Sequence, residues 1–506
     1  LGKNVPYRWL WWIVLGVVLI FVLLLVFIQS SVSKKQKQNQ MVLPSGETIV
    51  IPVLKKPLFA IAGSIISMVT GKLRGKGALS EFRKQFSGGD NKVIQNCLLF
   101  FPMVTISEAN LARQVLFAKQ SEVAKADMKS RFIERFLSQS ILLAPEDAWK
   151  RHKTALSPAF AWQHIQSILP EFIEIASDLQ KLWIQDGNTI KVFPWIKRAT
   201  LDAIGKGGFG FNFRALFEGE ESPEIKNYEE LMEELKKSIH FFDKLDSMLG
   251  TRKKMETQLD LFEEFMFRLM KEKRELANKE NYEPKDILDF LIAAQENHSL
   301  SDIEILHDLN TFFIAGHETT AGALNSAIHL LARSPEVQEK VRDEIRSVCG
   351  NNIPTYEDIR SMTFLECCLK ETLRLFPPAA MMTRSVIEDT EIGNLSIKKG
   401  TLLVINTVEI QKDTATWGLD AEEFRPERFL PENRKQVPKN AYFPFSMGNR
   451  QCIGNNFAQL EMRAMLAVLL NKFSFEPDLD SVERFDNFMG AVLTVNPECS
   501  LLVTPV

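Results

Sequence analysis

Hydrophobic positions along the chain recur mostly with the three-to-four residue spacing of an α-helix. The stretches with this spacing are residues 228–249, 254–278, 302–333, 336–348, 357–375 and 455–470. Ser334-Pro335 separates two of them, because proline ends one helix and readily begins the next. The pattern predicts that long helices make up most of the structure.

Strand-like patterns are few and short. Residues 93–100 and 103–106 have the composition of two strands, with Phe101-Pro102 as the turn between them. Residues 392–397 and 402–406 are two further strand-like stretches. The expected fold class is therefore mainly α with a minor β-sheet.

A charge-free stretch near the beginning predicts a membrane anchor. Residues 9–28 contain no charged side chain, and at about 1.5 Å per residue a helix of this length spans roughly 30 Å of hydrocarbon. Tryptophans stand at its beginning and lysines follow its end, which is typical of the two membrane interfaces. A cleaved signal peptide is the alternative, although its apolar core is usually only about 7 to 15 residues long.

The chain is expected to divide into an anchor, a linker and one large body. Residues 1–33 would form a single transmembrane helix, residues 34–75 a polar linker, and residues 76–506 the body. An apolar patch in the linker, residues 58–69, is too short to span a bilayer and could lie on its surface. The lysines that follow the anchor favour a body on the cytosolic side.

Composition narrows the classes of function. The chain has 506 residues, 45% hydrophobic and 25% charged, with a net charge of −3. These values are typical of a globular protein, and so balanced a charge gives no basic surface for nucleic acid. The six cysteines lack the spacing of a disulfide framework or a zinc ribbon. We therefore expect no nucleic-acid partner and no disulfide scaffold.

One loop before the last helical stretch concentrates candidate chemistry. Phe445, Gly448, Arg450, Cys452 and Gly454 fall within ten residues. A cysteine at the start of a helix can become a thiolate, because backbone N–H groups and the helix dipole lower its pKa. The glycines let the backbone approach a flat cofactor, the phenylalanine can shield the sulfur, and the arginine can pair with an acidic group. By its chemistry alone the cysteine could also be a reactive or a buried structural one.

This loop resembles a family signature. The pattern F-x-x-G-x-R-x-C-x-G resembles the haem-binding signature of the cytochrome P450 monooxygenases, and the resemblance extends over about residues 75–505. It implies the cytochrome P450 fold, with Cys452 as the axial thiolate ligand of the haem iron. Phe445, Arg450 and Gly454 would then contact the haem.

A charge network is implied by two further motifs. Glu371 and Arg374 match the family's E-x-x-R and lie three positions apart, on one face of a helix. Arg428 lies in a segment that resembles the family's P-E-R-F, whose arginine completes the network. Because buried charges are tolerated only when all are hydrogen-bonded, the network is expected to fix the chain near the haem rather than contact substrate.

The segment from Ala315 to Thr320 resembles the family's A-G-x-[D/E]-T-T. The resemblance implies that Thr319 hydrogen-bonds oxygen at the haem and that Glu318 relays protons. Glycine and threonine in a helix interior predict a local opening there. Taken alone, Thr319 could instead bond to its own helix and Glu318 could be solvated. His317 has no second histidine at metalloprotease spacing and is expected to be structural.

Contacts to the haem propionates are implied by other positions. Trp149 and Lys153 match the family's W-x-x-x-R, with lysine where arginine is usual. Lysine keeps the charge but lacks the bidentate fork, so Arg151 is an alternative partner. Arg384 resembles a further propionate-binding arginine. Ala315 stands where one branch of fatty-acid ω-hydroxylases carries a glutamate that esterifies haem, so noncovalent haem b is expected.

Together the resemblances imply a membrane-anchored haem monooxygenase. It would insert one atom of O2 into a lipophilic substrate, such as a fatty acid, a sterol or a xenobiotic. No G-x-G-x-x-G follows a predicted strand, so the electrons are expected from NADPH through a separate cytochrome P450 reductase, with a b-type cytochrome as a further donor. The expected location is the endoplasmic reticulum membrane, with a single span and the catalytic domain facing the cytosol.

Two rival functions differ from this one in testable ways. A haem-thiolate isomerase or dehydratase would rearrange a peroxide without O2 or a reductase, but its usual mark is a disrupted relay threonine, and Thr319 is intact. A noncatalytic haem or lipid binder would be favoured by a broken catalytic motif.

Asn310 and Phe313 are expected, by position alone, to face the substrate.

Overall fold

The computed structural model describes most of the chain. The described residues are 40–42, 48–50, 92–98, 101–126, 131–235, 251–279, 282–298, 300–479, 487–489 and 492–506. The expected anchor at residues 1–33 lies outside them, as do most of the linker and the apolar patch at residues 58–69. Within the described ranges, no helix is both long and apolar enough to cross a bilayer.

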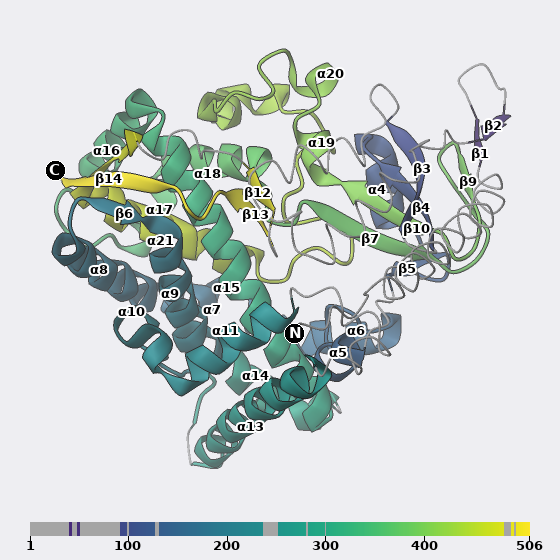
Figure 1. Cartoon of the computed structure of the whole chain (residues 1–506), viewed down its shortest axis with the longest axis horizontal. Helices are drawn as coiled ribbons and strands as arrows, with labels where there is room; N and C mark the ends of the chain where they lie inside the picture. Colours follow the sequence, from purple (N-terminus) through teal and green to yellow (C-terminus); the bar gives the residue numbers. More distant parts are fainter. Residues whose placement is uncertain are drawn as a thin grey trace, which may run out of the picture.

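The longest described helix is α15, Asp302–Ala332, and it confirms the helix expected over residues 302–333. It begins in a capping box, in which Ser301 and Glu304 each accept a hydrogen bond from the other's backbone N–H. The helix crosses the middle of the molecule and packs against helices on several sides (Figure 1). Most of its residues are buried, and polar ones such as Asp308, Asn310 and His317 are buried together with the apolar ones.

Shorter helices surround α15 (Figure 1). Those before it are α4 Ala109–Phe117, α5 Arg131–Phe136, α6 Glu146–Leu156, α7 Trp162–Ser167, α8 Leu169–Asp186, α9 Val192–Ile204, the π-helical turn η1 Gly205–Phe209, α10 Ala215–Glu218, the 3-10 turn η2 Gly219–Glu221, α11 Pro223–Leu235, α13 Thr251–Ala277 and α14 Ile287–His298. Those after it are α16 Pro335–Cys349, α17 Tyr356–Ser361, α18 Thr363–Leu375, α19 Thr407–Gln411, α20 Thr414–Trp417, the 3-10 turns η4 Pro426–Phe429 and η5 Pro431–Gln436, and α21 Asn455–Lys472.

The described strands form four small sheets, as a minor β component predicts. One sheet has the order β2-β1-β9-β8 and another the order β3-β4-β10-β7-β5; the remaining orders are β11-β14-β6 and β12-β13. The strands are β1 Gln40–Val42, β2 Thr48–Val50, β3 Val93–Leu98, β4 Phe101–Ile106, β5 Val123–Lys125, β6 Thr189–Lys191, β7 Met381–Val386, β8 Thr390–Ile392, β9 Leu395–Ile397, β10 Leu402–Asn406, β11 Phe473–Pro477, β12 Asn487–Met489, β13 Leu493–Val495 and β14 Ser500–Pro505.

The single helix expected over residues 357–375 is wrong, because the chain leaves the helical conformation at Met362. Helix α17 ends before that residue and α18 begins after it. The carboxylate of Glu344, on α16, accepts hydrogen bonds from the backbone N–H groups of Phe364 and Leu365 at 2.7 and 2.8 Å. A side chain from another helix therefore caps the first turn of α18, which the local pattern of residues 357–375 does not reveal.

Two strand predictions also need correction. Residues 392–397 form the ends of two strands, β8 and β9, which turn at Gly393 with a φ of +58°. Phe101 and Pro102, expected as a turn, belong to β4. Pro102 pairs only with β3, since the pairing of β4 with β10 starts at Met103, and its missing N–H is therefore tolerated.

The two largest hydrophobic cores of the described residues lie apart from each other. The larger core lies among the helices and includes Phe172, Leu324 and Leu466. The second lies on the five-stranded sheet and includes Val104 and Leu403. Figure 1 shows the helices gathered on one side of the molecule and strands β3, β4, β7 and β10 on the other.

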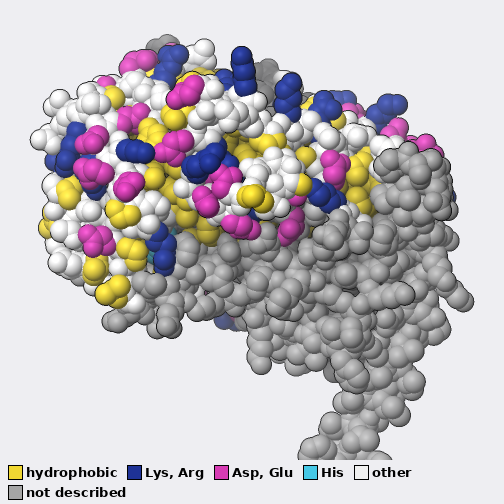
Figure 2. All heavy atoms as spheres, turned by 90° about the horizontal axis from the view of Figure 1, so that it is seen from above, with side chains coloured by type: hydrophobic (Ala, Val, Ile, Leu, Met, Phe, Trp, Pro, Cys, Tyr) yellow, Lys and Arg dark blue, Asp and Glu magenta, His cyan; other side chains and the backbone are white. Residues whose placement is uncertain are grey.

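The surface carries both signs of charge. Figure 2 shows Lys and Arg side chains interspersed with Asp and Glu over the described part of one face. This mixture agrees with the small net charge of −3.

Candidate active site

A cavity of about 510 Å³ lies between α15 and the loop that carries Cys452. Ala315, Gly316 and Thr319 line it from α15, at the spacing of one helix face. Cys452 is exposed to the cavity. The remaining lining includes Phe445 and Gly454 from the cysteine loop, together with Ile141, Phe312 and Met382.

The cysteine loop is a tightly closed turn. The Cys452 N–H donates to the Phe445 carbonyl at 3.0 Å, and the Gln451 N–H donates to the Gly448 carbonyl at 3.1 Å. Gly448 has a φ of +77°, and a Cβ there would lie 2.6 Å from the backbone oxygen of Leu116. Glycine is thus required at position 448 both by the backbone conformation and by the closeness of the last turn of α4.

The pKa of the Cys452 thiol is raised, contrary to the expectation that its surroundings lower it. Burial is the main cause, and a backbone hydrogen bond from Gly454 offsets it only in part. A thiolate at this position therefore needs a cation beside it, which is what an iron ion would provide.

Three of the expected propionate partners lie together at one side of the cavity. Lys153, Arg384 and Arg450 all line it, and none of the described lining residues is Asp or Glu. The Trp149 ring lies beneath two of these cations, 4.6 Å from the Arg450 guanidinium carbon and 4.9 Å from Lys153 Nζ. Arg450 also donates to the backbone oxygen of Ala144 at 2.8 Å, which fixes its orientation.

The structure distinguishes between Lys153 and Arg151. Lys153 lines the cavity, whereas the guanidinium of Arg151 pairs with Glu304 at 2.8 Å. The same helix, α6, is held to α15 by His152, whose Nδ1 lies 2.5 Å from an oxygen of Asp308. Burial alone would lower the pKa of His152, but Asp308 and Glu304 outweigh it and raise that pKa. This buried pair positions Trp149 and Lys153.

Lys125 is a fourth cation of the cavity and was missed by the sequence analysis. It ends β5 and pairs in register with Arg384 on β7. Burial, followed by the charges of Arg384 and Arg450, lowers the pKa of Lys125 to about 8. No local motif marks this lysine, because its place depends on the register between two strands far apart in the sequence.

The residues of the cavity fit a haem. A flat group with two carboxylates matches apolar walls, a thiol on one wall and four cations at one side. Burial, and then the charge of Arg384, lowers the pKa of both Lys125 and Arg450, and Glu146 offsets this only in part at Arg450. Two propionates would supply further negative charge beside these cations.

Thr319 lies in the cavity wall with its hydroxyl bonded to its own helix. The hydroxyl donates to the Ala315 carbonyl at 2.6 Å. Helix α15 continues through this position without interruption, so the expected local opening is not found. The hydroxyl satisfies the carbonyl of the preceding turn without displacing the helix.

Glu318 points away from the cavity and is not solvated. Its side chain is 9% exposed, and Oε1 lies 3.2 Å from the ammonium of Lys197, on α9. Glu318 is not among the residues that line the cavity. Lys197 belongs to no motif and was not predicted as a site residue, because it reaches Glu318 only through the packing of α9 on α15.

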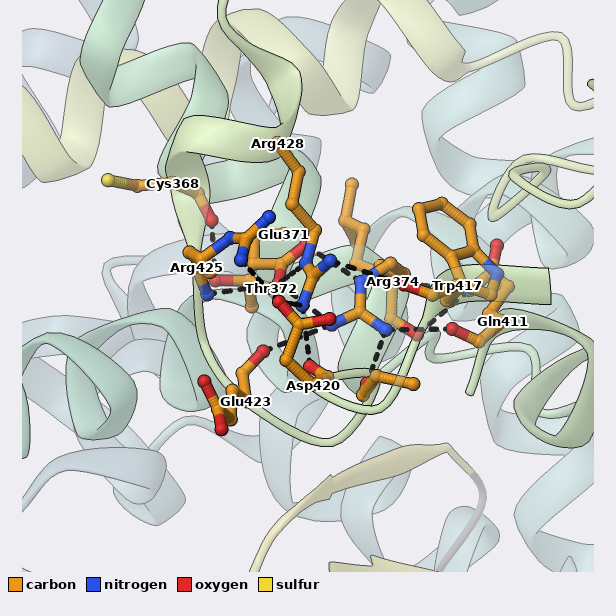
Figure 3. Close-up of polar contacts among 12 residues, drawn as sticks. Cys368, Glu371, Thr372, Arg374, Gln411, Trp417, Asp420, Glu423, Arg425 and Arg428 are labelled. Carbon is orange, nitrogen blue, oxygen red and sulfur yellow. Dashed lines mark hydrogen bonds and ion pairs between the residues drawn. The ribbon is translucent and has the colours of Figure 1, made fainter. Parts of the chain in front are cut away.

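Glu371, Arg374 and Arg428 are brought together as expected (Figure 3). Arg374 donates to both carboxylate oxygens of Glu371 at 2.7 Å, and Arg428 donates to one of them at 3.3 Å. Glu371 and Arg374 are fully buried. The other N–H groups of Arg374 donate to the carbonyls of Gln411, Ala421 and Glu423.

Asn310 and Phe313 do not line the cavity, contrary to expectation. Asn310 donates to the backbone oxygen of Phe136 at 3.1 Å, and Phe313 packs among other aromatic rings. Phe312 lines the cavity instead. The positions differ because successive residues of a helix point about 100° apart, so a shift by one residue changes the face.

Comparison with known proteins places the chain in a broad group of relatives. The family model described as cytochrome P450 matches residues 65–503. A self-sufficient cytochrome P450 monooxygenase of Phanerodontia chrysosporium is 32% identical, over 67% of this chain and 32% of that longer protein. A cytokinin hydroxylase of Arabidopsis thaliana is 28% identical, over 78% of this chain and 77% of that protein. Cytochrome P450 4F12 of Homo sapiens is 29% identical, over 74% of this chain and 76% of that protein.

Proposed function

The chain belongs to the cytochrome P450 family of haem monooxygenases, and from this premise we propose that it oxidises a fatty acid, a sterol or a xenobiotic. One atom of O2 enters a C–H or C=C group of the substrate and the other leaves as water, with two electrons from NADPH and two protons. The observation that carries the proposal is the apolar cavity that Cys452 and Thr319 both line.

Cavity residues would hold noncovalent haem b. Cys452 would supply the thiolate ligand of the iron, while Lys125, Lys153, Arg384 and Arg450 would pair with the two propionates. The bound haem would supply the iron chemistry that activates O2. Ala315 lines the cavity without a carboxylate, which supports attachment by contacts alone.

Thr319, Glu318 and Lys197 would supply protons. The side chain of Lys197 is 21% exposed and its ammonium pairs with the carboxylate of Glu318, so the pair would connect that carboxylate to solvent. Glu318 would turn from Lys197 toward the cavity and pass a proton to the side of Thr319. The Thr319 hydroxyl would then exchange its bond to Ala315 for one to a group in the cavity.

Apolar side chains would bind the substrate and exclude water. Ile141, Phe312 and Met382 line the cavity and offer no charge to a ligand. Such walls suit a lipophilic molecule and keep water from competing at the reacting atom. They support the broad class of substrate named above.

The remaining assignments concern partners and location. We propose a separate NADPH–cytochrome P450 reductase, with a b-type cytochrome as a further donor, docking near Gln451, which is exposed beside Cys452. We also propose the endoplasmic reticulum membrane, with a single span within residues 1–33, a linker at residues 34–75 and a catalytic body at residues 76–506 in the cytosol. The apolar stretch at residues 9–28 supports the span.

Spectroscopy of the reduced protein under carbon monoxide tests the thiolate. The wild type should give the red-shifted Soret band of thiolate ligation, and Cys452→Ala should lose it. Cys349→Ala, which removes another described free cysteine, is the matched control and should keep the band. A normal thiolate band in Cys452→Ala would reject the assignment.

Turnover tests the reaction class. The full-length protein is incubated with NADPH, a reductase and, in turn, dodecanoic acid, cholesterol and 7-ethoxycoumarin. Product that contains one atom from labelled O2 is the expected result. Conversion of a lipid hydroperoxide without NADPH or O2, together with no NADPH-dependent product, would favour the isomerase instead.

A further inference from the structure

His317 bridges two helices next to the proposed proton donor. It follows Gly316 in the cavity wall and precedes Glu318 on α15. Its side chain is buried, with an exposed fraction of 1%. Helix α9 approaches closely here, since a Cβ at Gly316 would lie 2.8 Å from the Ile204 side chain.

Two hydrogen bonds and a backbone contact hold His317. Its Nδ1 lies 3.1 Å from the hydroxyl of Tyr228, on α11. Its backbone carbonyl accepts a hydrogen bond from the Thr200 hydroxyl, on α9, at 3.2 Å. The imidazole lies against the backbone of Lys197, whose carbonyl is 3.1 Å from the same Thr200 hydroxyl.

Protonation states fix the direction of these bonds. Burial lowers the pKa of His317 to about 4, with Lys197 adding to the effect and Glu318 opposing it, so the ring is neutral near pH 7. Burial, and then Glu318, raises the pKa of Tyr228, so the phenol keeps its proton. The Tyr228 hydroxyl can thus donate to Nδ1, which leaves the proton of the neutral ring on the other nitrogen.

Lys197 is therefore held at both ends. Its backbone lies against His317 and shares the Thr200 hydroxyl with the His317 carbonyl, and its ammonium lies 3.2 Å from Glu318. A continuous chain of contacts runs from Tyr228 on α11, through His317, to Lys197 and Glu318. Each of these contacts involves a described side chain that is mostly or fully buried, where a hydrogen bond is both strong and costly to lose.

We propose that Tyr228 and His317 are positioning residues that hold Lys197 against Glu318, so that the place of α11 controls proton delivery beside Thr319. This inference rests on the proposed function, because it assigns residues that act through Glu318. It gives His317 a role in the reaction that its buried position alone would not suggest.

The variant Tyr228→Phe isolates the hydroxyl from the ring. The Tyr228 ring centroid lies 4.5 Å from that of Phe313 and 6.1 Å from that of Phe262, and phenylalanine keeps this packing. Tyr282→Phe is the matched control. Its hydroxyl donates to Asp289 at 2.8 Å, and that contact lies outside the cavity lining.

The test compares two routes to product. The substrate is the one among dodecanoic acid, cholesterol and 7-ethoxycoumarin that gives the most product with the wild type. One assay uses NADPH and reductase, and the other uses cumene hydroperoxide, which brings oxygen already reduced and needs no delivered protons. Haem content is measured from the carbon monoxide spectrum, and hydrogen peroxide is measured in parallel.

Tyr228→Phe should lower product per NADPH by roughly threefold or more, the effect of one lost hydrogen bond, with hydrogen peroxide in place of product. Haem content and peroxide-driven product should stay at the wild-type level, and Tyr282→Phe should change neither assay. His317→Phe should show the same defect, and the double variant should be no worse than the worse single variant.

Two results would overturn the inference while leaving the proposed function intact. One is wild-type coupling in Tyr228→Phe. The other is an equal loss in both assays, which would mean a general structural role. Absence of product from every substrate with the wild type would instead overturn the proposed function, and the inference with it.

Discussion

At the scale of single residues, Thr319 combines two properties. It lines the cavity, yet its hydroxyl is already donated to the Ala315 carbonyl at 2.6 Å. To donate a hydrogen bond to a group in the cavity, Thr319 must therefore give up its bond to the Ala315 carbonyl, so the number of hydrogen bonds does not increase. The exchange is favourable only if the new acceptor carries more charge than a carbonyl.

Thr319→Ala should uncouple the reaction. Haem binding should survive, because the side chain is not a ligand. Product per NADPH should fall by about tenfold, since one hydrogen bond to a charged group contributes roughly 1.5 to 3 kcal/mol. Hydrogen peroxide should replace the lost product when both are measured against NADPH consumed. Thr319→Ser keeps the hydroxyl and is the control; full coupling in the alanine variant would leave Thr319 as an ordinary helix residue.

Lys125 should make haem binding depend on pH. Burial, and then Arg384 and Arg450, lowers its pKa to about 8, so the site without haem loses this charge as the pH rises through 8. Propionates would raise the pKa again, and binding above pH 8 must then take up a proton. Haem affinity should therefore weaken between about pH 8 and about pH 10, where Arg450 in turn begins to lose its proton.

Haem titration of the haem-free protein measures this dependence. The affinity should fall by at most about tenfold per pH unit for one proton taken up. Lys125→Met should bind haem less tightly at neutral pH and show a flatter profile over the same range. An equally steep profile in the methionine variant would assign the proton to another group.

At the scale of elements, buried polar contacts decide how helices and irregular segments meet. Arg374 pairs with Glu371 on its own helix, α18. It also donates hydrogen bonds to backbone carbonyls from the end of α19 to the segment before η4. Arg428, on η4, donates a hydrogen bond to the same carboxylate and so links η4 to α18. Figure 3 shows the side chains converging on this point. The segment has little regular structure of its own, so its shape depends on these bonds.

Glu371→Gln should prevent stable folding. The variant leaves the buried guanidinium of Arg374 without a carboxylate and removes one of the two that Arg428 contacts, the other being Asp420 at 2.8 Å. Breaking a buried ion pair typically costs about 3 to 5 kcal/mol. We expect little haem-loaded protein, measured as the ratio of haem absorbance to protein absorbance. Glu357→Gln removes an exposed carboxylate 3.7 Å from Arg360 and should change stability by less than about 1 kcal/mol. A normal yield of haem-loaded Glu371→Gln would contradict the structural role.

The sequence predicted those elements that are determined by the pattern of their own residues. The helix at α15 and that at α21 have long apolar patterns, and both were expected within a few residues of their bounds. The break at Met362 was missed because its cap comes from Glu344 on another helix. Lys125 and Lys197 were missed for the same reason, since strand register and helix packing bring them to the site.

At the scale of the whole molecule, the cavity lies between two hydrophobic cores. Phe312 and Ile204 on its wall belong to the packing of the helices. Met382 packs against the core of the five-stranded sheet, on the same strand as Arg384. The cysteine loop contacts both cores, because Phe445 packs against the first and Met447 against the second.

Removal of residues 1–33 should separate membrane binding from haem binding. These residues contain the apolar stretch at residues 9–28, and no proposed haem contact lies among them. The shortened protein should sediment less with membranes and keep its carbon monoxide spectrum. Some association should remain through residues 58–69, and their further deletion is the control. Failure to take up haem would show that the anchor and the body are not independent.

The position of the cavity between the two cores has a consequence for how the protein matures in the cell. A group that contacts both cores stabilises their relative position. Because it binds the folded state, its binding raises the free energy of unfolding. Before haem arrives, the two halves are joined mainly by their own contacts, and the four cations at the junction repel one another. We therefore expect newly made chains to remain sensitive to proteases until haem is inserted. The supply of haem would then set how much of this protein a cell accumulates.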